Sequence, residues 1–89
     1  MIRSEAVIVN TLGLHARAAA RFVQLASRYS SRILVEHGAV TADGKSILGL
    51  LALLGRIGSR LTITAEGADE REAVRALCEL VAGRFGETR

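Results

Sequence analysis

The stretch RLTITAE, residues 60–66, decides the fold, because its side chains alternate strictly between apolar and polar. Leu61, Ile63 and Ala65 fall on one face of an extended chain, and the threonines fall on the other. Such alternation predicts a β-strand with one buried face, which is typical of antiparallel sheets covered on one side. We therefore expect a sheet whose apolar face is covered by helices.

The segment after this strand predicts the last helix. Gly67-Ala68 turns the chain, Asp69 is expected to cap the helix, and Glu72 completes a capping-box-like pair. Gly86 is a natural stop. Cys78 lies within the helical pattern, so we expect a small buried side chain rather than a redox role. The expected inner face is apolar at helical spacing and comprises Ala73, Val74, Leu77, Leu80 or Val81, and Phe85.

The first half of the chain predicts a strand followed by a helix. The β-branched run at residues 6–9 reads as the strand, and residues 10–13 as a turn. From Ala16 to about Tyr29 the period is helical, with arginines on the face opposite the apolar stripe. That stripe consists of Ala19, Phe22, Val23, Ala26 and Tyr29.

The middle of the chain predicts a hairpin and a short helix. Residues 32–36 and 39–42 read as strands, with His37-Gly38 as the tight turn between them. Ser46 is placed to cap a helix from Ile47 to about Leu54. The element order is then strand, helix, strand, strand, helix, strand, helix. We predict an α+β open-faced β-sandwich, with a four-stranded, mainly antiparallel sheet and three helices on one face.

The bulk composition indicates one small domain, residues 1–89, with a formal net charge of +3. Aromatic residues make up 3% and the basic residues do not cluster, which argues against nucleic-acid binding. The mild positive charge fits a protein partner with an acidic patch. We find no signal-peptide core, no membrane span and no metal-ligand spacing. We expect a cytoplasmic monomer without a cofactor.

His15 lies where the predicted turn gives way to the first helix, at the N-cap or beside it. The N–H groups of Ala16, Arg17 and Ala18 point out of that helix end, and the helix dipole favours anions there. The same dipole favours the neutral imidazole, which has a lone pair free for attack on phosphorus. The Arg17 guanidinium offers a planar fork that matches phosphate oxygens. Phosphoryl acceptance on His15 is therefore our leading hypothesis.

Taken alone, one histidine and one arginine near a helix start form a weak signal, since most surface histidines are simply solvated. His37, in the predicted turn, is interpreted as structural or neutral. Ser46 likewise has a plain interpretation as a helix cap.

Three segments carry a family resemblance. Residues 10–19, NTLGLHARAA, resemble the active-site segment of HPr, the histidine-containing phosphocarrier of the bacterial phosphotransferase system. Residues 44–53, GKSILGLLAL, are similar to the regulatory-serine region of that family. The segment EGADE at 66–70 and the helix ending in RFGE at 84–87 are similar too. The resemblance covers essentially the whole chain.

The resemblance implies that His15 accepts a phosphoryl group on Nδ1 from enzyme I and donates it to enzyme IIA domains. The chain would thus be a carrier acted on by partner enzymes, and not itself an enzyme. The matching serine in part of the family is phosphorylated by HPr kinase/phosphorylase, which implies regulation at Ser46. Many relatives have proline at the position of Ala18, and methionine at those of Leu48 and Leu51. We expect the site to work despite these departures.

A docking surface is expected where apolar residues of the second helix lie beside the arginines of the first. Its candidates are Arg17, Arg21, Ile47, Leu48 and Leu51, of which at least one or two apolar side chains should be exposed. Three other interpretations stay open: a nitrogen-branch relative, a purely regulatory relative, and a small nucleic-acid-binding domain.

Overall fold

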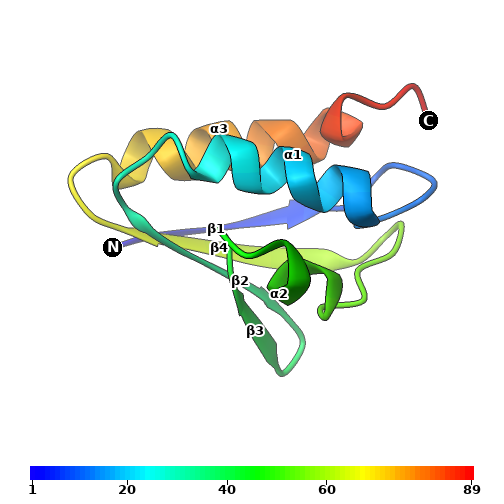
Figure 1. Cartoon of the computed structure of the whole chain (residues 1–89), viewed down its shortest axis with the longest axis horizontal. Helices are drawn as coiled ribbons and strands as arrows, with labels where there is room; N and C mark the ends of the chain where they lie inside the picture. The colour runs from blue at the N-terminus through cyan, green and yellow to red at the C-terminus, as the bar shows by residue number, and fades with distance from the viewer.

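The computed structural model describes all 89 residues, and its elements follow the predicted order (Figure 1). A short 3-10 turn, η1, is added after the last helix. The elements are β1 (Ile2–Val7), α1 (Ala16–Ala26), β2 (Arg32–His37), β3 (Val40–Asp43), α2 (Ile47–Leu51), β4 (Arg60–Glu66), α3 (Glu70–Ala82) and η1 (Arg84–Gly86).

The sheet has the strand order β1-β4-β2-β3, and every neighbouring pair is antiparallel. The alternating strand β4 pairs with β1 on one side and β2 on the other. In this register Ile63 lies opposite Val35, and Leu61 lies opposite Ala6, so their side chains share the buried face. The predicted α+β class and the one-sided sheet are confirmed.

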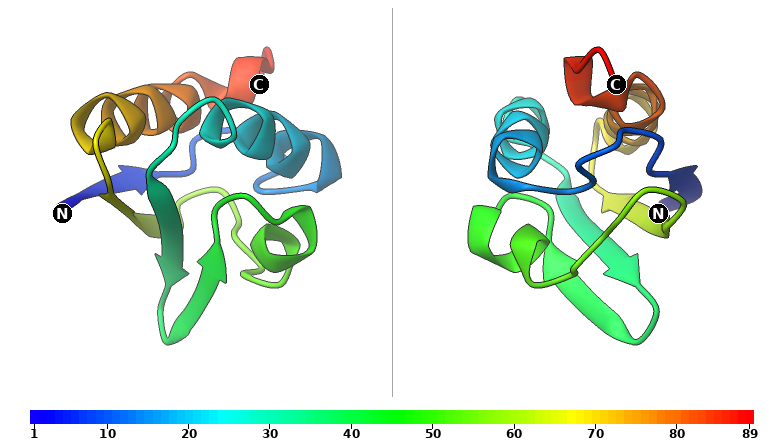
Figure 2. Two further views of the ribbon diagram at one scale, coloured as in Figure 1. Left: turned by 60° about the vertical axis from the view of Figure 1, so that its left-hand side comes forward. Right: turned by 90° about the vertical axis from the view of Figure 1, so that its right-hand side faces the viewer.

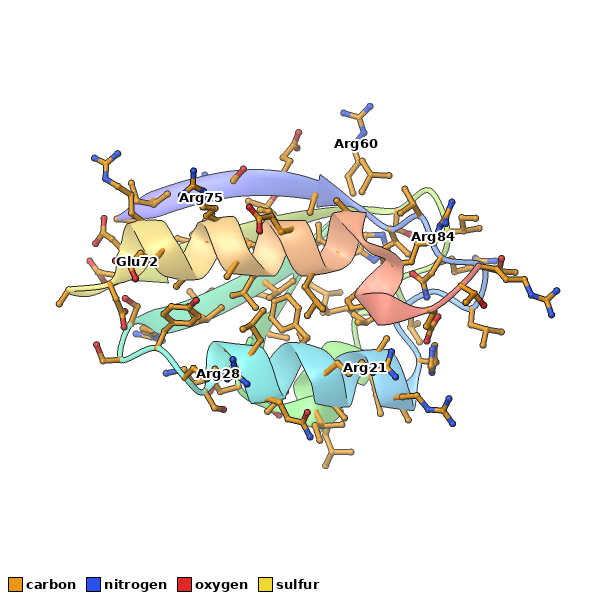
Figure 3. All side chains as sticks on the ribbon, turned by 90° about the horizontal axis from the view of Figure 1, so that it is seen from above. Arg21, Arg28, Arg60, Glu72, Arg75 and Arg84 are labelled. Carbon is orange, nitrogen blue, oxygen red and sulfur yellow. The ribbon has the colours of Figure 1, made fainter.

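All three helices lie on one face of the sheet, as the two views of Figure 2 show. Seen from above, α1 and α3 run side by side, and their inner side chains meet between them (Figure 3). Phe22 of α1 and Phe85 of η1 are both fully buried in this single core. None of the helices is long and apolar enough to span a bilayer.

Several predicted boundaries are wrong by one to four residues. β1 begins at Ile2 and ends at Val7, because its inward positions include the polar Ser4 and its alternation is therefore inconspicuous. β3 begins at Val40, and the hairpin turn is Gly38-Ala39, since His37 pairs with Val40.

Helices α1 and α2 end earlier than predicted. In both cases the last residues form tighter turns with hydrogen bonds to the third residue back. Tyr29 N–H donates to the Ala26 carbonyl, and Leu54 N–H donates to that of Leu51. Helical spacing therefore continues in the sequence after the α-helix itself has ended.

The capping-box prediction for α3 is also wrong. Asp69 occupies the N-cap position, but its side chain makes no capping hydrogen bond. Instead its carboxylate accepts hydrogen bonds from the Ser30 N–H and from the N–H and hydroxyl of Ser31. α3 ends at Ala82, before the predicted stop at Gly86. Cys78 is half-buried against the core rather than fully buried.

Candidate functional site

His15 is held at the start of α1 by the turn that precedes it. Gly13 has a φ of 68°, and a Cβ there would lie 2.7 Å from the Gly55 carbonyl oxygen. The next residue, Leu14, donates its N–H to that same carbonyl at 3.0 Å. A glycine is therefore needed for the close backbone approach that sets the position of His15.

The predicted N-cap role of His15 is confirmed. Its backbone is extended, with φ −82° and ψ 179°, and Ala19 donates the first helical hydrogen bond to its carbonyl at 2.8 Å. The N–H groups of Ala16, Arg17 and Ala18 therefore lie before the first helical bond, at the open end of α1. The Arg17 N–H donates to His15 Nδ1 at 3.2 Å.

A cleft of about 790 Å³ opens beside the imidazole. Its walls come from the loop before α1 together with the first two turns of that helix, and from the C-terminal segment, which meet at one end of the molecule (Figure 1). Three arginines from these two segments give the cleft a positive character suited to an anion. The lining residues are Thr11, Leu12, His15, Ala16, Arg17, Arg21, Gly86, Glu87, Thr88 and Arg89.

Glu87 is a site residue that the sequence did not indicate. One carboxylate oxygen contacts His15 Nε2, and the other accepts a hydrogen bond from Asn10 Nδ2 at 2.9 Å. Partial burial alone would raise the pKa of Glu87, but the hydrogen bonds from Asn10 and His15 outweigh it and lower that pKa below its ordinary value. Glu87 is therefore an anion that faces the imidazole from the side opposite the open helix end.

The turn after α3 carries Glu87 to this position. Arg84, Phe85 and Gly86 all have positive φ values, of 61°, 54° and 81°. The turn is fixed by burial of the Phe85 ring and by a hydrogen bond from the Arg21 guanidinium to the Phe85 carbonyl. Figure 3 labels Arg21 on α1 and Arg84 beside the turn. Two consecutive left-handed residues other than glycine are uncommon, so sequence patterns give no signal for this turn.

The Ser46 region lies on α2, which packs against α1. The predicted cap is confirmed, since Ser46 Oγ accepts the Gly49 N–H at 3.0 Å. Ile47 and Leu48 are exposed, the latter at 80%, whereas Leu51 is half-buried against the core. His37 Nδ1–H donates one hydrogen bond to the Leu53 carbonyl at 2.7 Å, away from the His15 cleft.

Comparisons with known proteins agree with this geometry. Residues 2–83 match the family described as PTS HPr component phosphorylation site. The chain is 44% identical to phosphocarrier protein HPr of Cupriavidus necator over 87 residues, which covers 98% of both chains. A crystal structure of HPr-C-His from Thermoanaerobacter tengcongensis superposes with a TM-score of 0.95 at 44% identity, covering 100% of both chains. The chain therefore belongs to the HPr family of phosphocarrier proteins.

The oligomeric state is not fixed by these relatives. Another crystal structure from Thermoanaerobacter tengcongensis is described as an HPr dimer. It has a TM-score of 0.78 and 48% identity, and covers 90% of this chain and 92% of that one. The monomer expected from the sequence therefore stays a prediction.

Proposed function

We propose that His15 accepts a phosphoryl group from enzyme I, which takes it from phosphoenolpyruvate, and donates it to enzyme IIA domains. The observation that carries this proposal is His15 at the N-cap of α1, beside a cleft lined by arginines. The chain is then a carrier and not an enzyme, because its partners supply the catalytic groups. Family membership supports this role and a cytoplasmic location.

The chemistry needs a lone pair on His15 Nδ1. That nitrogen attacks phosphorus, the N–P bond forms, and the bond from phosphorus to the donor breaks with its electron pair leaving on the donor. The N–H of Arg17, which faces Nδ1 at 3.2 Å, then turns to a phosphoryl oxygen together with those of Ala16 and Ala18. The exposed Arg17 guanidinium binds the same oxygens. Donation to enzyme IIA reverses these steps.

Ala18 keeps the backbone N–H that a proline would remove. Its side chain is fully buried in the first turn of α1. We propose that it adds one donor at the phosphate site without preventing transfer.

The proposal is tested by incubating the chain with enzyme I and phosphoenolpyruvate and measuring intact mass. We expect one acid-labile phosphoryl group on the wild type and none on His15→Ala. His37→Ala is the matched control, since the imidazole of His37 bonds to the Leu53 carbonyl, and it should be phosphorylated normally. An unmodified wild type would overturn the proposal.

We also propose that phosphorylation of Ser46 by an HPr kinase/phosphorylase weakens docking of enzyme I. The serine caps α2, so an added phosphate lies at a helix N-terminus, where the fold tolerates it. The new charge stands beside exposed Ile47 and Leu48, within a surface that also includes Arg17, Arg21 and half-buried Leu51. Partners of a basic surface carry acidic patches, which the phosphate repels.

Ser46→Asp and Ser46→Ala separate charge from capping. Aspartate keeps a capping oxygen and adds charge, and it should slow phosphorylation by enzyme I. Alanine removes the cap without adding charge, and its rate should match the wild type at temperatures below its unfolding transition. A wild-type rate for Ser46→Asp would refute the regulatory role.

A further inference from the structure

The hydrogen bonds around the His15 ring determine which nitrogen carries the proton. Nδ1 faces the Arg17 N–H, a donor, so the neutral ring must present a lone pair there. Nε2 faces the Glu87 carboxylate, which is an acceptor only, so the ring must present its proton there. Both contacts select the same tautomer, with the proton on Nε2 and the lone pair on Nδ1.

We propose that Glu87 is a positioning residue for phosphoryl transfer, holding the His15 imidazole in the tautomer whose Nδ1 is the nucleophile. The inference rests on the proposed function of His15 and extends it to a residue beyond the segment 2–83 that matches the family. A carboxylate bound to the far nitrogen of a histidine orients the ring and sets its tautomer at other catalytic and metal sites.

The same carboxylate favours the phosphorylated state. When Nδ1 bonds to phosphorus, the ring keeps its Nε2 proton and becomes cationic. The Glu87 anion faces that proton in a partly buried setting, with the Glu87 side chain 14% and that of His15 27% exposed. No proton leaves the ring in either direction of transfer. The imidazole therefore departs neutral, with its Nε2 proton in place, when an acceptor takes the phosphoryl group.

Glu87 is itself held rigidly enough for this role. Asn10 is fully buried, and its amide nitrogen donates to the Gly13 carbonyl at 2.8 Å as well as to Glu87. The nitrogen of Asn10 is thereby fixed toward Glu87, because both of its neighbours are acceptors. The left-handed turn at Arg84 and Phe85 persists in a strained conformation that its surroundings impose, as is common near functional sites.

The contacts of Glu87 with Asn10 and His15 predict an unusual result for Glu87→Gln. The glutamine oxygen must face the Asn10 amide, because two NH₂ groups cannot hydrogen-bond to each other. Its own NH₂ then faces His15 Nε2 and donates to it, which favours the tautomer with the proton on Nδ1. Glu87→Ala removes the contact and only relaxes the ring to the mixture of tautomers found in free imidazole. Glutamine should therefore harm the site more than alanine does.

The test uses the whole chain with ¹⁵N-labelled histidine, at an alkaline pH above which the ring ¹⁵N shifts no longer change. Long-range ¹H–¹⁵N spectra report the tautomer. We expect mainly the Nε2–H form in the wild type and a shift toward the Nδ1–H form in Glu87→Gln. The initial rate of phosphorylation by enzyme I should fall about tenfold in Glu87→Gln and about twofold in Glu87→Ala. Exposed Glu79→Gln on α3 is the matched control and should change neither.

The outcomes separate the two proposals. A purely packing role for Glu87 predicts that alanine is the more harmful change and that the tautomer in Glu87→Gln equals that of the wild type. Either of these results overturns the inference while leaving His15 as the acceptor. If the wild type accepts no phosphate, the proposed function fails, and the spectra still decide whether Glu87 sets the tautomer.

Discussion

Two carboxylates, one before α3 and one after it, contact opposite ends of α1, and they differ in function. Glu87, after α3, contacts His15 at the start of α1. Asp69, before α3, accepts three hydrogen bonds from Ser30 and Ser31, which follow α1. Both ends of α1 are therefore held by residues far away in the sequence, which lie before and after α3. Figure 1 shows α3 lying beside α1.

The difference lies in what the carboxylates bind. Asp69 is bound by donors that do not change their chemical state, namely the Ser31 hydroxyl and the N–H groups of Ser30 and Ser31. These hydrogen bonds lower the pKa of Asp69 to about 2. Glu87 shares its charge between a fixed amide and an imidazole that changes state when it is phosphorylated. The same chemical group thus serves as a permanent brace at one end and as part of a reactive site at the other.

The largest effect should come from Phe85→Ala, which removes the apolar anchor of the Glu87 end. The ring is fully buried, so truncation should lower the free energy of unfolding by about 3–5 kcal/mol, measured by urea denaturation. The turn at residues 84–86, which precedes Glu87, also loses the packing of the Phe85 ring that fixes it. The His15 ring should then show the relaxed tautomer mixture and slower phosphorylation in the fraction that remains folded.

Phe22→Ala is the matched control for this prediction. Phe22 is also fully buried, but it lies in the middle of α1 and not on the Glu87 turn. It should cost comparable stability and leave the His15 tautomer unchanged. Equal effects of both variants on the tautomer would mean that Glu87 is not held through Phe85.

The two ends also differ in how far the sequence predicts them. The alternation at Leu61, Ile63 and Ala65 predicts β4, and the turn chemistry before His15 predicts the N-cap, because both signals are local. Glu87 could not be predicted. Its partner lies 72 residues away in the chain, and it arrives there through left-handed residues that no sequence pattern marks. Local spacing predicts Asp69 as a helix cap, but the donors of Ser30 and Ser31 compete successfully for its carboxylate.

A smaller effect, confined to stability, should follow from Asp69→Asn. An amide offers one acceptor oxygen where the carboxylate offers two, so either the Ser30 N–H or the donors of Ser31 lose their partner. We expect the Tm at neutral pH to fall by about 5–10 °C. Phosphorylation of His15 below the Tm should be unchanged, since the change lies at the opposite end of α1.

The pH dependence of the Tm of Asp69→Asn tests whether the charge on Asp69 stabilises the fold. The folded pKa of about 2 lies below the ordinary value of 3.8, so Asp69 stabilises the fold above about pH 4, and this contribution is lost as the pH falls toward 2. The Tm of Asp69→Asn should therefore fall less than that of the wild type between pH 5 and pH 2, roughly the range in which this carboxyl titrates. Parallel curves for the two proteins would contradict the assignment of Asp69 as a charged brace.

The smallest effect should be an increase in the free energy of unfolding, caused by Arg84→Gly at the turn that precedes Glu87. Arg84 is exposed and has a φ of 61°, a region where a side chain costs about 1–2 kcal/mol and glycine does not. Glycine also increases the conformational entropy of the unfolded chain, which offsets part of this stabilisation. We therefore expect a net stabilisation of about 0.5–1 kcal/mol in urea denaturation.

Arg75→Gly in the interior of α3 is the matched control for Arg84→Gly, and it should instead lose about 1 kcal/mol. The tautomer of His15 should be the same in Arg84→Gly as in the wild type, because Phe85, Arg21 and Asn10 still fix the segment. A loss of stability in Arg84→Gly would show that the turn is not left-handed in solution. Glu87 would then reach His15, if at all, by another path.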